Sequence, residues 1–492
     1  MSRAVRWRYH EALAWLETHV NLEAVVAGRP EPSLDRIRHL CGLMGDPQSA
    51  FPVIHVTGTN GKGSTAKMTT ALLAERGLAV GTYTSPDLEG VNERLALTQG
   101  HIDAFEEADE DEEEAVAEPG SIDRTGVVRA PADGTAPTLD LPTPVMESIA
   151  DDDLAAVLEA VAGLEGLLDS PLTRFEILTA AAYRWFADVA VDVAVVEVGL
   201  GGLYDATNVA DGDVAVVTNV SLDHGDILGP LEGIAREKAG IVKPGSALVL
   251  GEISDALAPV FREAGAEQVW ELGRHFGVTA DRAAVGGRLV TLRTPTTEYE
   301  DVFLPVHGAH QATNAALALA AAEAFFGGPL PEDVVTGAFG GLRLPGRMEV
   351  MGRHPLVLLD GAHNVAGARA AAATVAEEFA GEEGLIAVVG MLQGKDPTEM
   401  LVALGLQTAR LVVACPAPSP RSLPAAAVAA AARSLGVDAV EAASVAEAVE
   451  AALDEAGEDD RVLVTGSLYV VGAARTALRA RPSDVGEEQA GQ

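Results

Sequence analysis

The sequence predicts an α/β protein with two domains. The first is a doubly wound, mostly parallel sheet with a P-loop, and the second is a smaller Rossmann-like α/β domain at the C-terminus. Valine-rich apolar runs at 191–198 and 214–220 are typical of parallel strands that helices cover on both faces. Each run ends in Gly-rich polar residues. Gly and Pro interrupt the pattern at 341–350, and a new βα alternation follows. We therefore expect domains at 1–342 and 343–492.

Composition limits the class of protein before any motif is considered. The chain has 492 residues, of which 48% are hydrophobic, so it has ample material for a packed core. No apolar run approaches the ~20 residues of a membrane span, and the N-terminus lacks the apolar stretch of a secretory signal. Cys41 and Cys415 have no metal-type spacing, and a protein with two distant cysteines fits a reducing cytoplasm. We expect no membrane partner. A net charge of −39 argues against nucleic-acid binding.

The first hundred residues alternate between helices and strands. Apolar residues at helical spacing predict a helix over 9–23, and Ser33 is a candidate cap for the next helix. Further elements follow from the same reasoning: a helix at 34–44, a strand at 51–56, a helix at 65–76 and a strand at 79–84. Ser85-Pro86 ends the last strand at its carboxyl end, where open α/β sheets bind ligands.

An acidic, Pro- and Gly-rich insertion occupies about 99–144 and includes EEADEDEEE. Low hydrophobicity and dense like charge cannot offset the entropy lost on ordering, so we expect disorder there. The insertion can be interpreted either as a solvated loop or as an acidic segment that binds a partner. After it the expected elements are helices at 153–168, 173–189, 236–241 and 308–325, and strands at 247–250, 289–293, 299–304, 356–359, 385–389, 411–414 and 462–464.

The strand at 51–56 leads into a glycine-rich turn and a helix. This arrangement aims backbone N–H groups and the positive end of a helix dipole at one anion. Gly58, Gly61 and Gly63 allow close approach and positive φ, Lys62 supplies charge for β/γ-phosphates, and Ser64 supplies a hydroxyl for Mg²⁺. The pattern predicts ATP binding by Gly58, Thr59, Asn60, Gly61, Lys62, Gly63, Ser64 and Thr65. The alternative is a glycine-rich βα turn without a ligand.

The motifs together resemble one family. In the family's order stand IHVTGTNGKGST, TSP-L---NERL, FEILTAAAY--FA, VEVGLGG--DATN, TN-SLDH, REKAGI-KPG, GAHQ-TNAALAL, LPGRME, DGAHN and VTGSLYVVG. The chain resembles folylpolyglutamate synthase/dihydrofolate synthase of the Mur ligase superfamily. This resemblance implies an ATP-dependent ligase that forms C–N bonds, joining L-glutamate to dihydropteroate or reduced folates through an acyl phosphate. It also implies a monomer with small-molecule partners.

The resemblance assigns metal and catalytic roles. Glu197, at the end of a buried strand, would bind Mg²⁺ together with Ser64, and His224 would hold a second Mg²⁺. Lys238 resembles the family lysine that CO₂ carbamylates, so Lys62, Lys238 and His224 are the catalytic candidates. Each of these residues also has a purely structural alternative. Glu197 could be an ion-paired glutamate, His224 a structural histidine, and Lys238 a surface lysine paired with Glu232 or Glu237.

Other positions carry the nucleotide and glutamate roles of the family. Asn314, Arg347 and Asp360 resemble nucleotide contacts, whereas His363 and Ser467 resemble glutamate-side contacts. DGAHN is otherwise a polar βα turn, and a serine at a strand end is often only a helix cap.

The folate side would be formed by Ser85, Pro86, Thr173, Phe175, Asp205 and Ala206. Phe175 either stacks on a flat pterin or belongs to the core. The sequence departs from the family pattern at Asp87, at Leu203-Tyr204 and at Gly394. These departures leave open whether both ligase activities are present or only folylpolyglutamate synthase. An alternative from another class is a non-catalytic nucleotide-binding protein.

Overall fold

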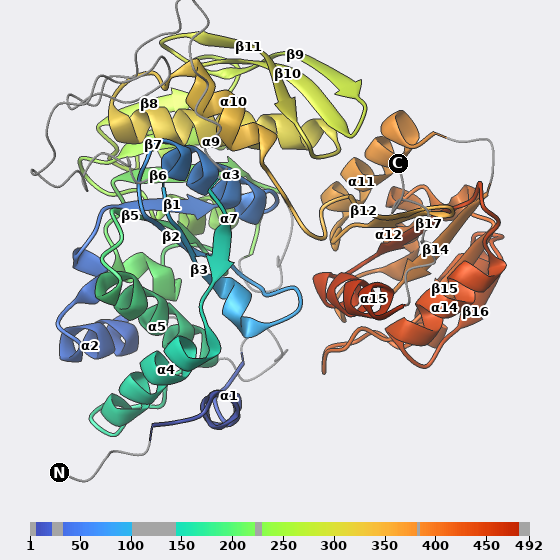
Figure 1. Cartoon of the computed structure of the whole chain (residues 1–492), viewed down its shortest axis with the longest axis horizontal. Helices are drawn as coiled ribbons and strands as arrows, with labels where there is room; N and C mark the ends of the chain where they lie inside the picture. The colour runs from blue at the N-terminus through green and yellow to red at the C-terminus, as the bar shows by residue number, and fades with distance from the viewer. Residues whose placement is uncertain (1–5, 22–32, 101–143, 222–228, 381–383, 482–492) are drawn as a thin grey trace, which may run out of the picture.

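The structure, a computed structural model, describes residues 6–21, 33–100, 144–221, 229–380 and 384–481. Figure 1 shows two α/β bodies side by side, each built on its own sheet. Most of the expected acidic insertion, and His224, lie outside the described residues. The two sheets confirm the predicted fold class.

The first body is built on an eight-stranded sheet in the order β4-β3-β2-β5-β1-β6-β7-β8. Strands β2, β5, β1, β6, β7 and β8 run parallel, and β3 and β4 add an antiparallel edge. The strands are β1 Val53–Thr57, β2 Val80–Tyr83, β3 Leu95–Thr98, β4 Met146–Ser148, β5 Val193–Glu197, β6 Val214–Asn219, β7 Ala247–Glu252 and β8 Gln268–Glu271. Strand β1 lies between β5 and β6, so the loop that follows it opens at the middle of the sheet.

Helices cover both faces of this sheet, as the valine-rich strands require (Figure 1). The apolar cluster on one face includes residues of α3, α9 and α10, and that on the other includes residues of α1, α2, α4 and α5. The helices are α1 Tyr9–Glu17, α2 Asp35–Leu43, α3 Lys62–Glu75, α4 Asp151–Glu165, α5 Arg174–Asp188, α7 Leu231–Ala239, α8 Ala258–Arg262, α9 Ala309–Phe326 and α10 Glu332–Gly340.

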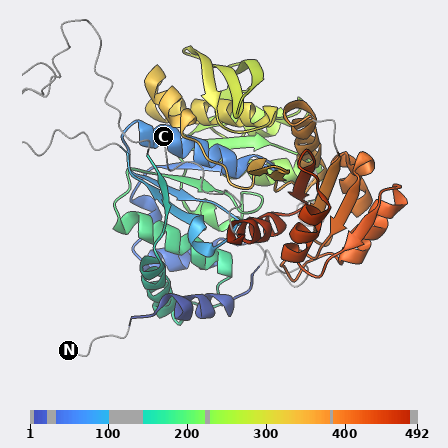
Figure 2. The same cartoon turned by 45° about the vertical axis from the view of Figure 1, so that its right-hand side comes forward.

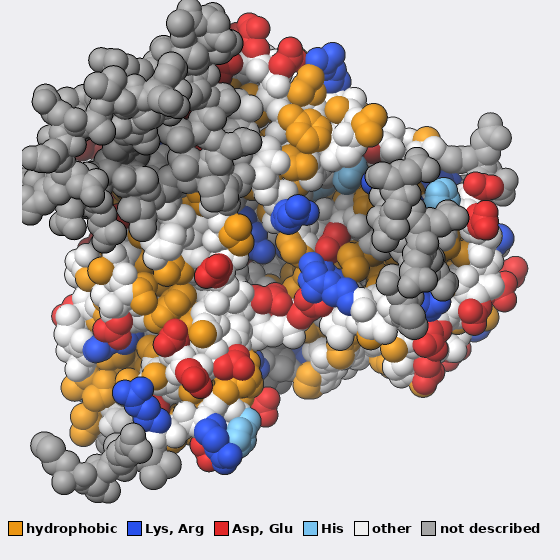
Figure 3. Space-filling model, viewed as in Figure 1, with side chains coloured by type: hydrophobic (Ala, Val, Ile, Leu, Met, Phe, Trp, Pro, Cys, Tyr) orange, Lys and Arg blue, Asp and Glu red, His pale blue; other side chains and the backbone are white. Residues whose placement is uncertain are grey.

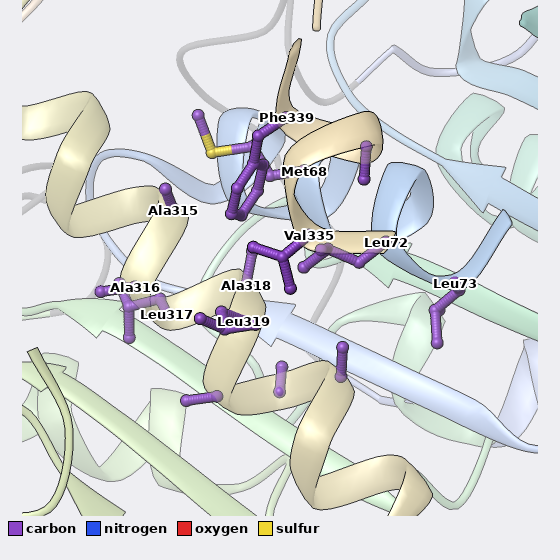
Figure 4. Packing of buried hydrophobic residues seen from close by; sticks show 14 of the residues in the cluster. Met68, Leu72, Leu73, Ala315, Ala316, Leu317, Ala318, Leu319, Val335 and Phe339 are labelled. Atoms are coloured by element: carbon purple, nitrogen blue, oxygen red, sulfur yellow. The ribbon is translucent and has the colours of Figure 1, made fainter. Parts of the chain in front are cut away.

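Figure 4 shows how α3 is fixed against α9 and α10. The labelled part of α9 is rich in alanine, and these small side chains let the two helices approach closely. Met68 and Leu72 of α3 fill the space against Phe339 and Val335 of α10 (Figure 4). Because α3 begins at the phosphate loop, this packing holds that loop on a rigid support.

A three-stranded antiparallel sheet adjoins the first domain: β9 Gly277–Ala284, β10 Gly287–Arg293 and β11 Glu298–Leu304. The sequence predicted β10 and β11 and missed β9, whose side chains are mostly exposed and carry little apolar signal.

The second body has a six-stranded sheet in the order β12-β13-β17-β14-β15-β16, parallel except for β12. Its strands are β12 Glu349–Arg353, β13 Leu356–Leu359, β14 Leu385–Val389, β15 Leu411–Ala414, β16 Ala439–Glu441 and β17 Arg461–Thr465. Its helices are α11 Val365–Glu378, α12 Pro397–Ala403, α13 Ala425–Ser434, α14 Val445–Glu455 and α15 Leu468–Ala480. The position of the domain boundary at 342/343 stays a prediction.

Several boundaries differ from the expected ones for local reasons. Helix α3 begins at Lys62 rather than at residue 65, because Gly61 takes φ 84° and starts the helix directly after the turn. Helix α7 begins at Leu231, earlier than the expected 236, and α1 ends at Glu17 rather than at residue 23. Residues 95–98, to which no element was assigned from the sequence, form β3, which lies between β4 and β2.

The space-filling view in Figure 3 shows acidic side chains along the outer edge of the second domain. Exposed carboxylates there come from α14 and the segments beside it: Glu441, Glu447, Glu450, Asp454, Glu455, Glu458 and Asp459. In the described part of the chain no helix has both the length and the apolar character needed to cross a bilayer.

Candidate active site

A cavity of about 1000 Å³ is lined by residues of both domains. Nearly all the predicted site residues line it: Gly58, Thr59, Asn60, Gly61, Lys62, Gly63, Ser64, Ser85, Pro86, Thr173, Phe175, Glu197, Asp205, Ala206, Lys238, Asn314, Arg347, Asp360, His363 and Ser467. Thr65 is fully buried and is not part of the lining. His224 lies outside the described residues, so its role stays a prediction.

The backbone of the phosphate loop needs glycine at two positions. Gly58 has φ 152°, and a Cβ there would lie 1.8 Å from Oγ1 of Thr218. Gly61 has φ 84°, and a Cβ there would lie 2.4 Å from Oδ1 of Asn314. Both positions combine a backbone conformation that side chains disfavour with a neighbour that leaves no room for one. The glycines of the motif are therefore required by contact with β6 and α9.

The end of β6 holds the loop at Asn60. Thr218 Oγ1 donates to the Asn60 carbonyl at 2.6 Å, and Asn219 Nδ2 donates to the same oxygen at 3.0 Å. The Asn60 N–H in turn donates to Asn219 Oδ1 at 3.0 Å. Neither residue was predicted to have a role, although both end a parallel strand, which is the signal that identified Glu197.

Two lysine side chains bind backbone carbonyls of the loop. Lys62 Nζ donates to the carbonyls of Gly58 and Thr59, each at 3.3 Å. Lys238 Nζ, which comes from α7, donates to the Gly58 carbonyl at 2.7 Å, and the residue is only 4% exposed. The alternative of a surface location is therefore wrong for Lys238. The two ammonium groups bring positive charge to the place where the loop would receive phosphate.

Glu197 is a buried carboxylate at the end of β5. Its Oε2 accepts the Ser85 N–H at 3.0 Å, and within the described residues it forms no ion pair. Burial raises the pKa of its carboxyl, although the charge of Lys62 and the Ser85 hydrogen bond oppose that rise. A Cβ at Gly63 would lie 3.3 Å from the carboxylate, so the absence of a side chain there keeps the loop close to it.

These groups fit a magnesium ion that shares its shell with phosphate. The described residues contain no cluster of three His, Cys, Asp or Glu side chains that could hold a metal by themselves. Mg²⁺, however, usually takes one or two carboxylates and completes its shell with phosphate oxygens and water. The buried Glu197 carboxylate and the Ser64 hydroxyl, both at the cavity wall, supply the oxygen donors that such a site needs.

Helix α9 contributes amides to the same wall. Asn314 Nδ2 donates to Gln311 Oε1 at 3.0 Å, and Thr65 Oγ1 donates to Asn314 Oδ1 at 3.5 Å. His310 also lines the cavity, and burial lowers the pKa of its imidazole while Asp360 opposes that change. No role was predicted for His310 from the sequence.

The second domain meets the phosphate loop through the DGAHN segment. Asn364 Nδ2 donates to Asn60 Oδ1 at 2.9 Å, which joins the two domains directly at the loop. Asn364 also caps α11 by accepting the Gly367 N–H at 2.9 Å. Asp360 accepts the N–H groups of Met348 and Ala362 at 2.9 and 3.0 Å, so this carboxylate shapes the turn as well as lining the cavity. The contribution of Asn364 was missed, because its partner lies 304 positions away.

Arg347, His363 and Ser467 also line the cavity from the side of the second domain. Ser467 caps α15 by accepting the Tyr469 N–H at 3.2 Å, which is the structural role that the sequence left open for it. His363 Nδ1 lies 2.9 Å from the Gly361 carbonyl.

On the far side of the cavity, α5 presents Thr173 and Phe175. Thr173 forms a capping box with Glu176, in which each side chain binds the other's backbone N–H. The ring centroids of Phe175 and Tyr83 lie 6.0 Å apart, and Phe175 also lines the cavity. Phe175 therefore packs against the core and still presents its ring to the cavity, as the two predicted alternatives each require in part. Asp205 accepts the N–H groups of Leu200 and Thr207, so its carboxylate folds the loop after β5.

The departure at Asp87 has a local explanation. Arg94 Nε donates to Asp87 Oδ1 at 2.6 Å, and Arg94 is 3% exposed. Burial acts against ionisation, but the Arg94 guanidinium lowers the pKa of the Asp87 carboxyl overall. Asp87 therefore remains an anion that fastens the loop after Ser85-Pro86, and it does not line the cavity.

Comparison with known proteins places this geometry in a family. Residues 153–322 match the Mur ligase middle domain, and residues 346–468 match the Mur ligase glutamate ligase domain. The chain is 38% identical to the dihydrofolate synthase/folylpolyglutamate synthase of Mycobacterium tuberculosis over 92% of this chain and 91% of the relative. It is 31% identical to the folylpolyglutamate synthase of Lacticaseibacillus casei over 90% and 94% of the two chains.

A solved structure agrees with the fold. The folylpolyglutamate synthase of Mycobacterium tuberculosis complexed with ADP superposes with a TM-score of 0.81 at 35% identity, covering 96% of this chain and 99% of that one. Both Mur ligase domains, the shared fold and the cavity between the domains lead to one conclusion. The chain belongs to the dihydrofolate synthase/folylpolyglutamate synthase family of Mur ligases.

Proposed function

We propose that the cavity joins L-glutamate to the carboxylate of a pteroate or folate at the expense of ATP. The observation that carries the proposal is the composition of the cavity wall. One wall holds a phosphate loop, a buried carboxylate and two lysines, and the opposite wall comes from the glutamate ligase domain. An amide ligase has to place three substrates in one water-poor space, and a cavity shared between two domains meets that need.

ATP occupies the loop from Gly58 to Thr65 in this proposal. The loop N–H groups and Lys62 bind the phosphates, as expected for a glycine-rich turn at the start of a helix. Bound Mg²⁺ would neutralise developing phosphate charge, held by Glu197 and the Ser64 hydroxyl. Asn314, Arg347 and Asp360 complete the nucleotide side, and Arg347 brings a permanent positive charge from the junction between domains.

The substrate carboxylate enters from the side of Ser85, Pro86 and Phe175. It attacks the γ-phosphorus, the bond to ADP breaks, and an acyl phosphate forms. The glutamate amine then attacks the acyl carbon, loses its proton, and displaces phosphate. His363 and Ser467 lie on the wall from which glutamate would approach, because both belong to the glutamate ligase domain.

Four finer parts belong to the same proposal. Lys238 is carbamylated, and isotopically labelled bicarbonate with NMR detection tests this. His224 binds a second Mg²⁺. The enzyme works as a monomer in the cytoplasm. The two functional domains divide at 342/343.

Omission of single substrates tests the proposed function. Release of ADP should require ATP, glutamate and a pteroate or folate together. ADP released at the same rate without glutamate or without the folate would contradict ligation. Lys62→Ala should remove turnover and leave the thermal unfolding midpoint unchanged, because its side chain is only partly buried and binds two carbonyls.

Two activities are compatible with the site. We propose that both are present, because the relative from Mycobacterium tuberculosis bears both names. The relative from Lacticaseibacillus casei is named for folylpolyglutamate synthase alone. Parallel assays with dihydropteroate and with tetrahydrofolate decide between them: turnover of both supports two activities, and turnover of tetrahydrofolate alone supports the single one.

A further inference from the structure

One side chain, Glu93, binds most of the backbone N–H groups of the loop that follows Ser85-Pro86, residues 87–90. Glu93 accepts the N–H groups of Leu88, Glu89 and Gly90 at 3.0, 3.1 and 3.2 Å. A carboxylate with three consecutive backbone N–H groups around it is a strongly held arrangement. The loop therefore moves as one unit with Glu93.

The tip of this loop lies against the second domain. Leu88 packs against the apolar cluster of that domain, although it belongs to the first. A Cβ at Gly472 of α15 would lie 1.8 Å from the Leu88 carbonyl oxygen, so α15 reaches the loop only because residue 472 is glycine. Figure 2 shows α15, in dark red, beside the blue segments of the first domain. Close contact at Gly472 places the next turn of α15 over Glu89.

One guanidinium on that next turn joins three parts of the molecule. Arg475 Nη1 donates to Glu89 at 2.5 Å, and Arg475 Nε donates to both oxygens of Glu349 at 3.0 Å. Arg479 Nη1 and Thr476 Oγ1 of the same helix also donate to Glu89, at 3.1 and 3.2 Å, but among the described residues only Arg475 joins Glu89 to Glu349. Glu349 also accepts the Gly346 N–H at 2.8 Å, one residue before the cavity-lining Arg347. Arg475 is 8% exposed, so these ion pairs are poorly screened by solvent.

We infer that Arg475 is a positioning residue, which fixes the loop 87–90 and hence the folate side of the cavity against the glutamate ligase domain. The inference rests on the proposed function. Arg475 touches no substrate, because it does not line the cavity. It acts through Glu89, which sets where Ser85 and Pro86 stand relative to Ser467 at the start of the same helix α15.

The test compares Glu89→Gln, Arg475→Gln and the double variant with the unchanged enzyme. Glu89→Gln removes the charge that faces α15 and keeps the Arg475–Glu349 pair. We expect the KM for the folate substrate to rise about tenfold, equivalent to ~1.4 kcal/mol. The KM for ATP should stay within about twofold and the thermal unfolding midpoint should not move, because a lost contact at the loop tip leaves the phosphate loop intact. A purely structural role would shift stability without separating the two KM values.

The double variant supplies the second criterion. If Arg475 acts on the loop through Glu89, the folate KM of the double variant should equal that of Glu89→Gln alone; additive effects would overturn the inference. Arg433→Gln is the matched control, because Arg433 forms an exposed pair with Glu441 at 3.7 Å in the same domain and should change neither KM.

The outcomes separate this inference from the proposed function. If the wild-type enzyme turns over no pteroate or folate, the proposed function itself is contradicted. If the wild-type enzyme is active and the Glu89→Gln variant has the same folate KM, only the positioning role of Arg475 is contradicted. If Arg475→Gln does not fold, Glu89→Gln still decides, because it leaves the Glu349 pair in place.

Discussion

Replacement of Glu197 by glutamine should stabilise the protein and inactivate it. The carboxylate is buried without an ion pair among the described residues, and burial raises its pKa. Glutamine keeps an oxygen that can accept the Ser85 N–H, now at 3.0 Å, and removes the buried charge. Exchanging a poorly compensated buried charge for a neutral group stabilises by about 1–3 kcal/mol. For a chain of 492 residues we expect the midpoint of thermal unfolding to rise by about 1–3 °C without ligands.

The pH dependence gives the sign of this effect. Because the folded pKa of Glu197 lies above its unfolded value, the folded state binds the proton more tightly. The contribution of Glu197 to stability is therefore fully present below about pH 4, and is lost as pH rises through the folded pKa. Glu197→Gln should remove that loss, so the difference in the free energy of unfolding between variant and unchanged protein should grow with pH across this window.

Calorimetry and an ADP-release assay measure the two halves of the prediction. Turnover should fall on the order of a hundredfold or more, because the metal loses its carboxylate. The matched control is Glu176→Gln: Glu176 is also buried but pairs with Arg36 at 3.0 Å, so its replacement should lower the midpoint. An unchanged or lower midpoint for Glu197→Gln together with retained turnover would refute the reasoning.

Two further predictions concern the strand β1 and its loop. Gly58→Ala should prevent ATP binding, because a Cβ would lie 1.8 Å from Thr218 Oγ1 at a φ of 152°; equilibrium titration with a nucleotide should show at least about a tenfold loss of affinity, and unchanged affinity would contradict the geometry. His55 is fully buried, which lowers its pKa to about 3, so protons bind the unfolded chain first. The free energy of unfolding should therefore fall by up to ~1.4 kcal/mol per pH unit from about pH 6 to about pH 3, and His55→Leu should flatten that slope in denaturant titrations at several pH values. An equal slope in both proteins would show that other groups dominate.

The central strands and the phosphate loop could be predicted because their signals are local. Continuous valine runs predicted β5 and β6, and the spacing of glycine, lysine and serine predicted the loop between β1 and α3. Strands β3, β4, β12 and β16 were missed because they are short, with three to five residues and little periodicity, and all but β3 lie at the edge of a sheet. The order of strands in each sheet depends on packing between distant segments, which no local pattern encodes.

The residues of the site divide in the same way. Glu197 ends a buried strand and Asp360 follows one, so their place at the carboxyl ends of the sheets could be expected. The environment of Lys238 could not be predicted, because it depends on how α7 packs. A Cβ at Gly202 would lie 2.5 Å from the Glu237 carbonyl oxygen, so the end of α7 packs closely against the loop that follows β5. The ion pair of Glu89 and Arg475 could not be predicted either, because the two residues lie 386 positions apart in the sequence.

Transfer of labelled glutamate tests the proposed ligation most directly. Purified enzyme would be incubated with ATP, labelled L-glutamate and dihydropteroate or a reduced folate, and the folate product would be separated and its label compared with the ADP formed. We predict one glutamate incorporated for each ADP released, with no label in the product when the folate is omitted. Release of ADP without labelled folate product would contradict an amide ligase acting in this cavity.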